Sequence, residues 1–143
     1  VSGMCIGGPY ITGLCMAAPE RIAATVIVQP IGLDNNQQAF YEMFDGWRVE
    51  VAPGHPEADE AAFDTFRSNM YDGDFLFNTT RDQAAAIETP TMLLMGSDLY
   101  HPESTSRELA ALMPNCTFIE DWKDGDALAS ATAEISAFLG QAS

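Results

Sequence analysis

The sequence opens on Val1-Ser2-Gly3-Met4-Cys5-Ile6-Gly7-Gly8, which has the pattern of a strand end that meets a glycine-rich turn. Within this stretch, residues 3–7 form the motif G-x-C-x-G. The serine version of the motif is a sharp turn between a strand and a helix, in which the middle residue has a strained backbone conformation. Its neighbours two positions away must therefore be small. We predict such a turn with Cys5 at its apex.

A thiol at this apex has the surroundings that a nucleophile needs. It stands exposed at the N-terminus of the next helix, where the helix dipole and free N–H groups favour a thiolate. The N–H of Ile6 would point at the oxyanion that develops when the thiol of Cys5 attacks a carbonyl group. The alternative interpretation is a glycine-rich turn with a buried cysteine, because free cysteine is among the most buried residue types.

The chain after this motif alternates between strand and helix patterns. β-Branched or apolar runs bounded by Pro and Gly predict buried strands, and apolar residues at i, i+3 and i+4 predict helices. We expect helices at 10–18, 103–113 and 127–139, and strands at 24–29, 91–95 and 116–120. This alternation is typical of an α/β fold, in which a mostly parallel sheet carries helices on its faces.

Residues 34–88 differ in character, because they carry aromatic and sulfur side chains at helical spacing. One stripe consists of Phe40, Met43, Phe44, Trp47 and Val51, and a second consists of Phe63, Phe66 and Met70. Most stripes of this kind belong to a core. We expect a few of these side chains to wall a pocket for an apolar acyl or ring group.

The composition excludes several classes of partner. The chain has 143 residues, enough for one domain with a real core, and 47% of them are hydrophobic. It has 21 acidic and 6 basic side chains, and 21 − 6 gives a net charge of −15. Such an acidic protein does not suit a nucleic-acid backbone or an anionic membrane surface as its main partner. No apolar run reaches the ~18 residues of a membrane span, and nothing at the start resembles a signal peptide.

The cysteines and histidines do not form a metal-binding pattern. Cys5, Cys15 and Cys116 are odd in number and lack C-x-x-C spacing, which argues against a disulfide framework and a zinc cluster. The two histidines lie far apart, so we expect no metal. Neither a phosphate loop nor a dinucleotide fingerprint is present, so we also expect no cofactor. Free thiols suit a reducing compartment, and we predict a cytoplasmic location.

In this order, the elements resemble the C-terminal half of an α/β-hydrolase, with the helical insert in the place of the lid. The stretch Gly3–Gly8 is similar to the nucleophile elbow of dienelactone hydrolases, which use cysteine in a Cys-His-Asp triad. In that fold the acid commonly follows a later strand in a G-x-D turn, and Gly96-Ser97-Asp98 fits this motif. The resemblance implies Cys5 as nucleophile and Asp98 as acid. Asp98 could instead be an ordinary turn aspartate, and Asp34 is a second candidate for the acid.

The base is where the sequence departs from the family. In α/β-hydrolases the histidine follows the last strand and precedes the last helix, but residues 121–126 contain none. His101 lies three residues after Asp98, on the loop that should border the site, and is our candidate base. The alternative is that His101 begins a helix before Pro102 and packs against the lid, with the base supplied from upstream. His55, in a Gly-His-Pro turn, is predicted at the surface.

The resemblance also divides the chain. It implies an α/β-hydrolase core formed by 1–33 and 90–143, with a lid over 34–89. We expect the substrate pocket to be walled by Met4, Tyr10, Phe44, Trp47 and Tyr100. The early strands of the fold, and the second oxyanion donor that follows one of them, have no counterpart in these residues. We therefore expect an upstream segment or a second chain to supply them, and a homodimer is a further expectation.

Two kinds of function fit these observations. The first is a hydrolase that cleaves an ester, thioester or lactone of a small molecule through an acyl-cysteine, with His101 as base. The second is a binding protein on the same scaffold that has lost its base, or a subunit fragment that completes a partner chain. The cysteine turn favours the first, and the missing histidine at 121–126 favours the second. Fold analogy alone does not choose between them.

Overall fold

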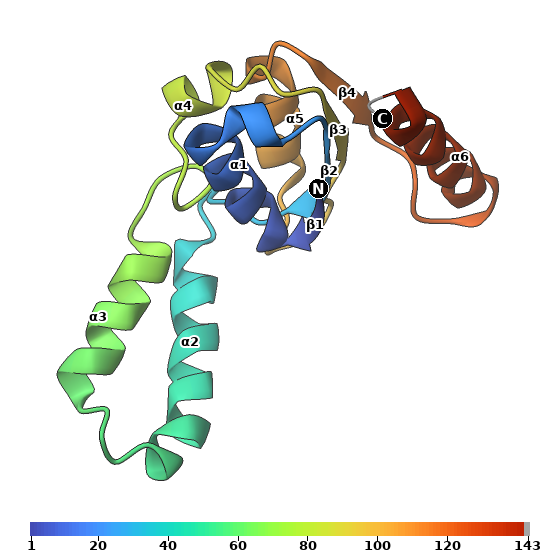
Figure 1. The fold of residues 1–143 in the computed structure, drawn as a ribbon. Helices are drawn as coiled ribbons and strands as arrows, with labels where there is room; N and C mark the ends of the chain where they lie inside the picture. Colours follow the sequence, from blue (N-terminus) through green and yellow to red (C-terminus); the bar gives the residue numbers. More distant parts are fainter. Residues whose placement is uncertain (142–143) are drawn as a thin grey trace.

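The computed structural model describes residues 1–141 and centres on one parallel sheet (Figure 1). Its strands are β1 (Ser2–Cys5), β2 (Thr25–Pro30), β3 (Thr91–Leu94) and β4 (Cys116–Ile119). They pair in the order β1-β2-β3-β4, and all three pairings are parallel. All four strands therefore end at the same edge, which is where open α/β sheets bind their ligands. The predicted α/β class with a parallel sheet is confirmed.

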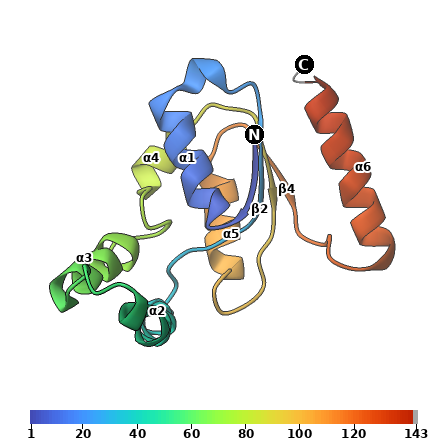
Figure 2. The ribbon, with the colours of Figure 1, turned by 60° about the horizontal axis from the view of Figure 1, so that its bottom comes forward.

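Helices cover both faces of this sheet. Figure 2 shows α1 (Gly7–Ala17) and α5 (Glu103–Leu112) on one side and α6 (Gly125–Gln141) on the other. Successive strand residues point to opposite faces, so Ile27 and Leu93 pack toward α1 and α5. Their neighbours Val26 and Met92 belong to the second cluster, with α6. A strand buried on both faces is continuously apolar, as the sequence showed.

The region between β2 and β3 contains a helical hairpin that projects away from the sheet (Figure 1). It consists of α2 (Gln37–Val51), a 3₁₀ turn at Ala52–Gly54, and α3 (Glu60–Tyr71). The carboxylate of Asp59 accepts a hydrogen bond from the Ala62 N–H and so begins α3. The buried side chains of Phe40, Phe44, Phe63 and Tyr71 form an aromatic cluster with Ile31, and Cys5, Ile6 and Tyr100 pack against it.

The predicted elements are all present, with shifted ends. The first helix begins at Gly7 rather than Tyr10, because Gly and Pro are tolerated in a first helical turn, where the N–H groups lack intrahelical partners. A short helix, α4 (Arg81–Ala85), was not predicted. It begins with a capping box formed by Thr80 and Gln83, a signal that the sequence does contain. Within residues 1–141, no helix combines the length and apolar character needed to cross a bilayer.

Candidate active site

The turn at Cys5 is sharp, as the motif predicts. Cys5 lies at the junction of β1 and α1 and has a φ of 57°. Residues other than glycine rarely adopt a positive φ. A Cβ on Gly3 would lie 3.1 Å from the Gly7 Cα, and one on Gly8 would lie 2.7 Å from the Pro30 Cβ. Crowding by the Gly7 backbone thus explains Gly3, and crowding by Pro30 explains Gly8. Gly7, which we expected to be small for the same reason, has open space around its Cα.

The start of α1 places hydrogen-bond donors beside this turn. Ile6 is the N-cap residue, with helical backbone angles and no side-chain cap. The first N–H groups of a helix have no intrahelical acceptor, so they are available to an anion at the N-terminus. The Ile6 N–H, the predicted oxyanion donor, belongs to this set.

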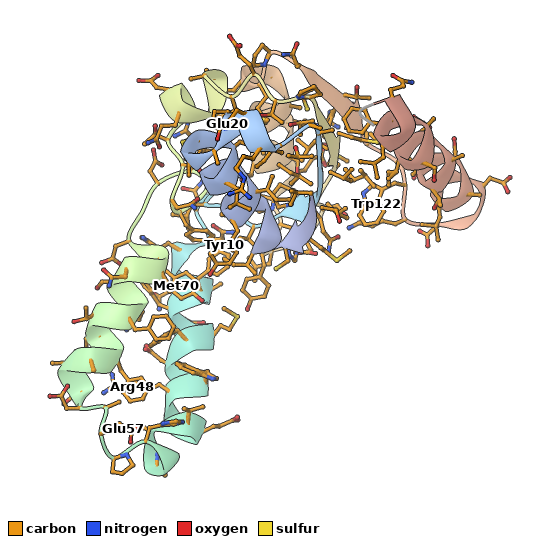
Figure 3. All side chains as sticks on the ribbon, in the orientation of Figure 1. Tyr10, Glu20, Arg48, Glu57, Met70 and Trp122 are labelled. Carbon is orange, nitrogen blue, oxygen red and sulfur yellow. The ribbon has the colours of Figure 1, made fainter. Side chains whose placement is uncertain are left out.

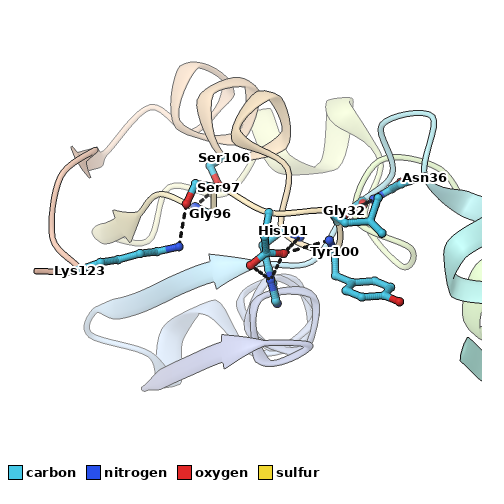
Figure 4. A network of polar contacts seen from close by, with 10 residues as sticks. Gly32, Asn36, Gly96, Ser97, Tyr100, His101, Ser106 and Lys123 are labelled. Atoms are coloured by element: carbon cyan, nitrogen blue, oxygen red, sulfur yellow. Dashed lines mark hydrogen bonds and ion pairs between the residues drawn. The ribbon is translucent and has the colours of Figure 1, made fainter.

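Asp98 and His101 contact each other on the loop that follows β3 (Figure 4). The His101 Nδ1 lies 2.7 Å from Asp98 Oδ1 and 2.9 Å from Oδ2. The backbone N–H groups of Tyr100 and His101 also donate to Oδ1, each at 3.0 Å. Burial by itself raises the pKa of the Asp98 carboxyl, but the hydrogen bonds from His101 and Tyr100 outweigh it and hold the pKa below its usual value.

This contact also decides the state of the imidazole. A carboxylate only accepts hydrogen bonds, so the Nδ1 that faces it carries a proton. In the neutral ring, Nε2 is then a free base. Among the described residues, the buried Nε2 of His101 has no hydrogen-bond partner. A buried polar atom without a partner is costly, and an unpaired imidazole nitrogen is available to take a proton from a nearby acid.

Cys5 and His101 line one cavity of about 370 Å³ at the carboxyl edge of the sheet. Its floor and walls are otherwise apolar or aromatic: Ile6, Ile31, Phe40, Met43, Met70, Tyr71 and Tyr100. The tertiary structure therefore brings together a thiol, an unpaired imidazole nitrogen and a carboxylate, from loops that are far apart in the sequence. A cavity of this size is in the range of small-molecule sites.

A second cavity, of about 320 Å³, lies in the helical hairpin. It shares Met43, Met70 and Tyr71 with the first and adds Phe44, Trp47 and Phe66. The predicted pocket residues thus divide into separate groups. Tyr100 lines the first cavity, and Phe44 and Trp47 line the second. Tyr10 is 59% exposed and lines a smaller cavity of about 170 Å³ together with Met70 (Figure 3), while Met4 is 55% exposed and lines none of the three.

The walls of the first cavity include residues beyond the five that we predicted by number. Phe40 and Met70 belong to the helical stripes, of which a few side chains were expected to wall a pocket, and Ile31 lies outside the stripes. The stripe spacing could have indicated the hairpin residues, since one helix face carries Phe40, Met43, Phe44 and Trp47. Exposure corrects the expectation that the stripes are mainly core: Met43, Trp47 and Phe66 are each more than 40% exposed.

The loop with Asp98 and His101 is held by neighbours on three sides. A Cβ on Gly96 would lie 2.4 Å from the His101 carbonyl oxygen, so this position requires glycine. The Gly96 N–H donates to Ser106 Oγ. Buried Asn36, at the start of α2, donates to the carbonyl groups of Gly32 and Leu99 (Figure 4). Asn36 thereby connects the base of the hairpin to the loop.

The other candidates have different partners. Asp34 is exposed, and its carboxylate accepts hydrogen bonds from Ser104 and Asn35 rather than from a histidine. His55 lies at the surface, as predicted, with its Nδ1 2.8 Å from Glu57 Oε1. In the loop after β4, Lys123 Nζ donates to Ser97 Oγ and Trp122 Nε1 donates to the Met95 carbonyl.

Comparison with known proteins identifies the fold. The sequence matches no family model and no curated protein. Solved structures do match. Rv0554 of Mycobacterium tuberculosis matches with a TM-score of 0.67 and 15% sequence identity, and the match covers 99% of this chain and 65% of that one. An α/β hydrolase of Sphaerobacter thermophilus matches with a TM-score of 0.54 and 19% sequence identity, over 94% of this chain and 65% of that one.

A meta-cleavage product hydrolase of Pseudomonas fluorescens matches at a TM-score of 0.62 and 15% identity, over 99% of this chain and 64% of that one. The chain therefore has the α/β-hydrolase fold. It spans about two thirds of the length of these proteins. At such low identity, the likeness concerns the fold and leaves the chemistry to be argued from the site.

Proposed function

We propose that this chain, which has the α/β-hydrolase fold, carries the nucleophile, base and acid of a hydrolase that cleaves an ester, thioester or lactone. One observation carries the proposal. Cys5, in its strained turn, lines the same cavity as His101, whose Nε2 is buried and unpaired while its Nδ1 contacts Asp98. This arrangement supports the roles of nucleophile, base and orienting acid for Cys5, His101 and Asp98, since a triad depends on geometry and roles rather than on sequence order.

The steps follow from these roles. His101 Nε2 takes the thiol proton as Cys5 Sγ attacks the substrate carbonyl, and the Ile6 N–H donates to the resulting oxyanion. The tetrahedral intermediate collapses to an acyl-cysteine, and His101 returns the proton to the leaving alcohol or thiol. Water then attacks the acyl-cysteine, with His101 as base, and releases the acid and the free thiol. Asp98 keeps the imidazole oriented and stabilises its cationic form.

We propose further that residues 34–89, which contain the hairpin, act as a lid over a core of 1–33 and 90–143, of which 142–143 lie outside the described residues. The hairpin helices contact the rest of the chain mainly through one end, where Asn36 meets Leu99. Segments with few contacts open more easily than core strands. We expect faster amide exchange in 37–71 than in β2 and β3, measured by hydrogen–deuterium exchange. Equal protection of hairpin and sheet would contradict this.

We also propose that a further segment or second chain pairs with β1. This strand lies at the edge of the sheet, and Val1 and Met4 are both 55% exposed. An open parallel edge invites pairing, and parallel sheets are ordinarily covered on both faces. Such a segment would also supply the second oxyanion donor.

The three cysteines are free, which supports our prediction of a reducing compartment such as the cytoplasm.

The proposal is tested by the order in which the thiols react. Burial raises the pKa of Cys15, and raises that of Cys116 to about 11, so both are poor nucleophiles near neutral pH. We expect iodoacetamide to label Cys5 first in the native protein. An aryl ester should leave an acyl group on Cys5, visible by peptide mass spectrometry, and Cys5→Ala should abolish both reactions. The proposal would be contradicted if no thiol reacted first in the native protein and all three were labelled equally only after unfolding.

The second candidate is a binding protein of the same fold, or a subunit that completes a partner chain. It is favoured by the loop after β4, where the fold ordinarily carries its histidine and this chain has Trp122 and Lys123. In that case ligand binding would persist in Cys5→Ala, and no acyl adduct would form on the native protein.

A further inference from the structure

We propose that the groove in the helical hairpin is a subsite for the acyl arm of the substrate, and that this substrate is an uncharged ester. The inference rests on the proposed function, because it places the reacting carbonyl group at Cys5. It goes further, because it assigns the second cavity to the acyl arm and excludes substrates whose acyl arm carries a negative charge. The groove is defined here by Met43, Phe44, Trp47, Phe66, Met70 and Tyr71.

The first step is continuity between the two cavities. Met43, Met70 and Tyr71 line both the cavity of Cys5 and the groove. The two cavities therefore adjoin along these three side chains, and we place the acyl arm of a carbonyl beside Cys5 across them. A binding surface for a partner helix or a second copy of the chain would not need to share side chains with the cavity of the thiol. We therefore assign the groove to the substrate.

The second step is the chemistry of the walls. The groove is formed by aromatic rings in mutual edge-on or tilted contact, with ring centroids of Phe44 and Phe66 5.4 Å apart and those of Trp47 and Phe66 5.9 Å apart. Trp47 and Phe66 are 41% and 46% exposed. Water therefore contacts apolar surface that an alkyl or aryl arm would cover, and methionines adapt to the shape of such an arm.

The third step is charge. Among the described residues, neither cavity is lined by lysine or arginine. The nearby arginines of the hairpin are already paired: Arg48 with Glu60 and Asp64, and Arg67 with Asp45. The net charge of −15 adds a general repulsion. A carboxylate or phosphate on the acyl arm would lose its hydration without gaining a partner, so the site disfavours acidic substrates.

A series of aryl esters tests the acyl subsite. From acetyl through butyryl and hexanoyl to octanoyl, kcat/KM should rise by up to about fourfold per added methylene, the factor for burying one CH₂ group. Trp47→Ala should flatten this rise, because it removes the largest aromatic wall of the groove. Val49→Ala is the matched control, since this α2 side chain is 75% exposed and lines neither cavity. A flat series in the unmutated protein, with normal acetyl-ester turnover, would overturn the subsite and leave the proposed function standing.

A binding experiment separates the inference from catalysis. In Cys5→Ala, which cannot form an acyl-cysteine, methyl octanoate should change the tryptophan fluorescence, and Trp47→Phe should remove the change. Monomethyl suberate has the same chain length but ends in a carboxylate, and we expect its affinity to be at least about tenfold lower. Equal binding of the two esters would overturn the charge assignment. Concentration-dependent dimerisation that itself buries Trp47 would show that a second copy occupies the groove, and would overturn the subsite.

Discussion

Two loops at the carboxyl edge of the sheet differ in the titratable groups that they carry, and the histidine lies on the loop where the resemblance does not place it. The loop after β3 carries Asp98 and His101 in direct contact, with the second ring nitrogen unpaired. The loop after β4, where the resemblance places the histidine, carries Trp122 and Lys123. Both of these side chains donate hydrogen bonds back to the first loop, at Met95 and Ser97.

Under the proposed function, the difference teaches that acid and base share one loop, which another loop holds in place. In the β3 loop, Asp98 and His101 are only three positions apart, so one short turn brings the ring onto the carboxylate. The β4 loop then needs no titratable group that reaches the cavity. We interpret it as a support for the first loop, and the experiments below test this division of roles.

The largest expected effect separates the two loops directly. His101→Ala should lower kcat/KM for an aryl ester by about 10²–10⁴, the usual contribution of a general base. Lys123→Ala should change it by less than about threefold, because its ammonium contacts Ser97 rather than the cavity. Steady-state kinetics measure both, with His55→Ala as the control for loss of a surface histidine. A large loss in Lys123→Ala with none in His101→Ala would reverse the assignment.

Asp98→Asn should have the next largest effect, about 10² in kcat/KM, because an amide cannot stabilise the cationic imidazole. It should also change the acid stability. The folded protein holds the Asp98 pKa below its usual value. The ionised carboxylate therefore stabilises the folded state fully above the pKa of the unfolded chain, and this stabilisation disappears as the pH falls through the pKa of the folded state. The difference in unfolding free energy between Asp98→Asn and the unmutated protein should therefore shrink below about pH 4, as measured by urea unfolding. A difference that grew in acid would contradict this.

Moving the histidine tests whether the second loop can replace the first. Lys123→His in a His101→Ala background should recover less than about tenfold of the lost activity, because Lys123 contacts Ser97 and lines neither cavity. The single variant Lys123→His serves as the control for folding. Recovery to the unmutated rate would show that the β4 loop reaches the cavity after all.

The smallest effects concern the supports of the first loop. Asn36→Ala leaves the Gly32 and Leu99 carbonyl groups without their buried donor, and should lower the free energy of unfolding by about 1–3 kcal/mol. Trp122→Phe removes one half-buried hydrogen bond to Met95 and should cost about 1 kcal/mol. Thermal or urea unfolding measures both. A greater loss in Trp122→Phe would make the β4 loop, rather than Asn36, the main support.

Much of the fold could be predicted from local signals. The apolar runs of β2 and β3 between Pro and Gly, and the 3.6-residue spacing in the helices, depend only on neighbouring residues. The motif at residues 3–7 predicted the sharp turn at Cys5, and its Gly3 is crowded as expected. Gly7 is not crowded, whereas Gly8, which lies outside the motif, is. The helix α4 was missed because its five residues are too few for a periodic pattern, although its capping box was present.

The sequence by itself determined a parallel α/β sheet, a strained turn at Cys5, and a carboxylate and imidazole three residues apart after β3. Only the tertiary structure decided which of these groups face one cavity. Cys5 and Met70 line one cavity although they lie more than sixty positions apart in the sequence. Such contacts depend on how layers pack, for which no local period exists. For the same physical reason, the exposure of Trp47 and the direction of Lys123 toward Ser97 could not be predicted from the sequence.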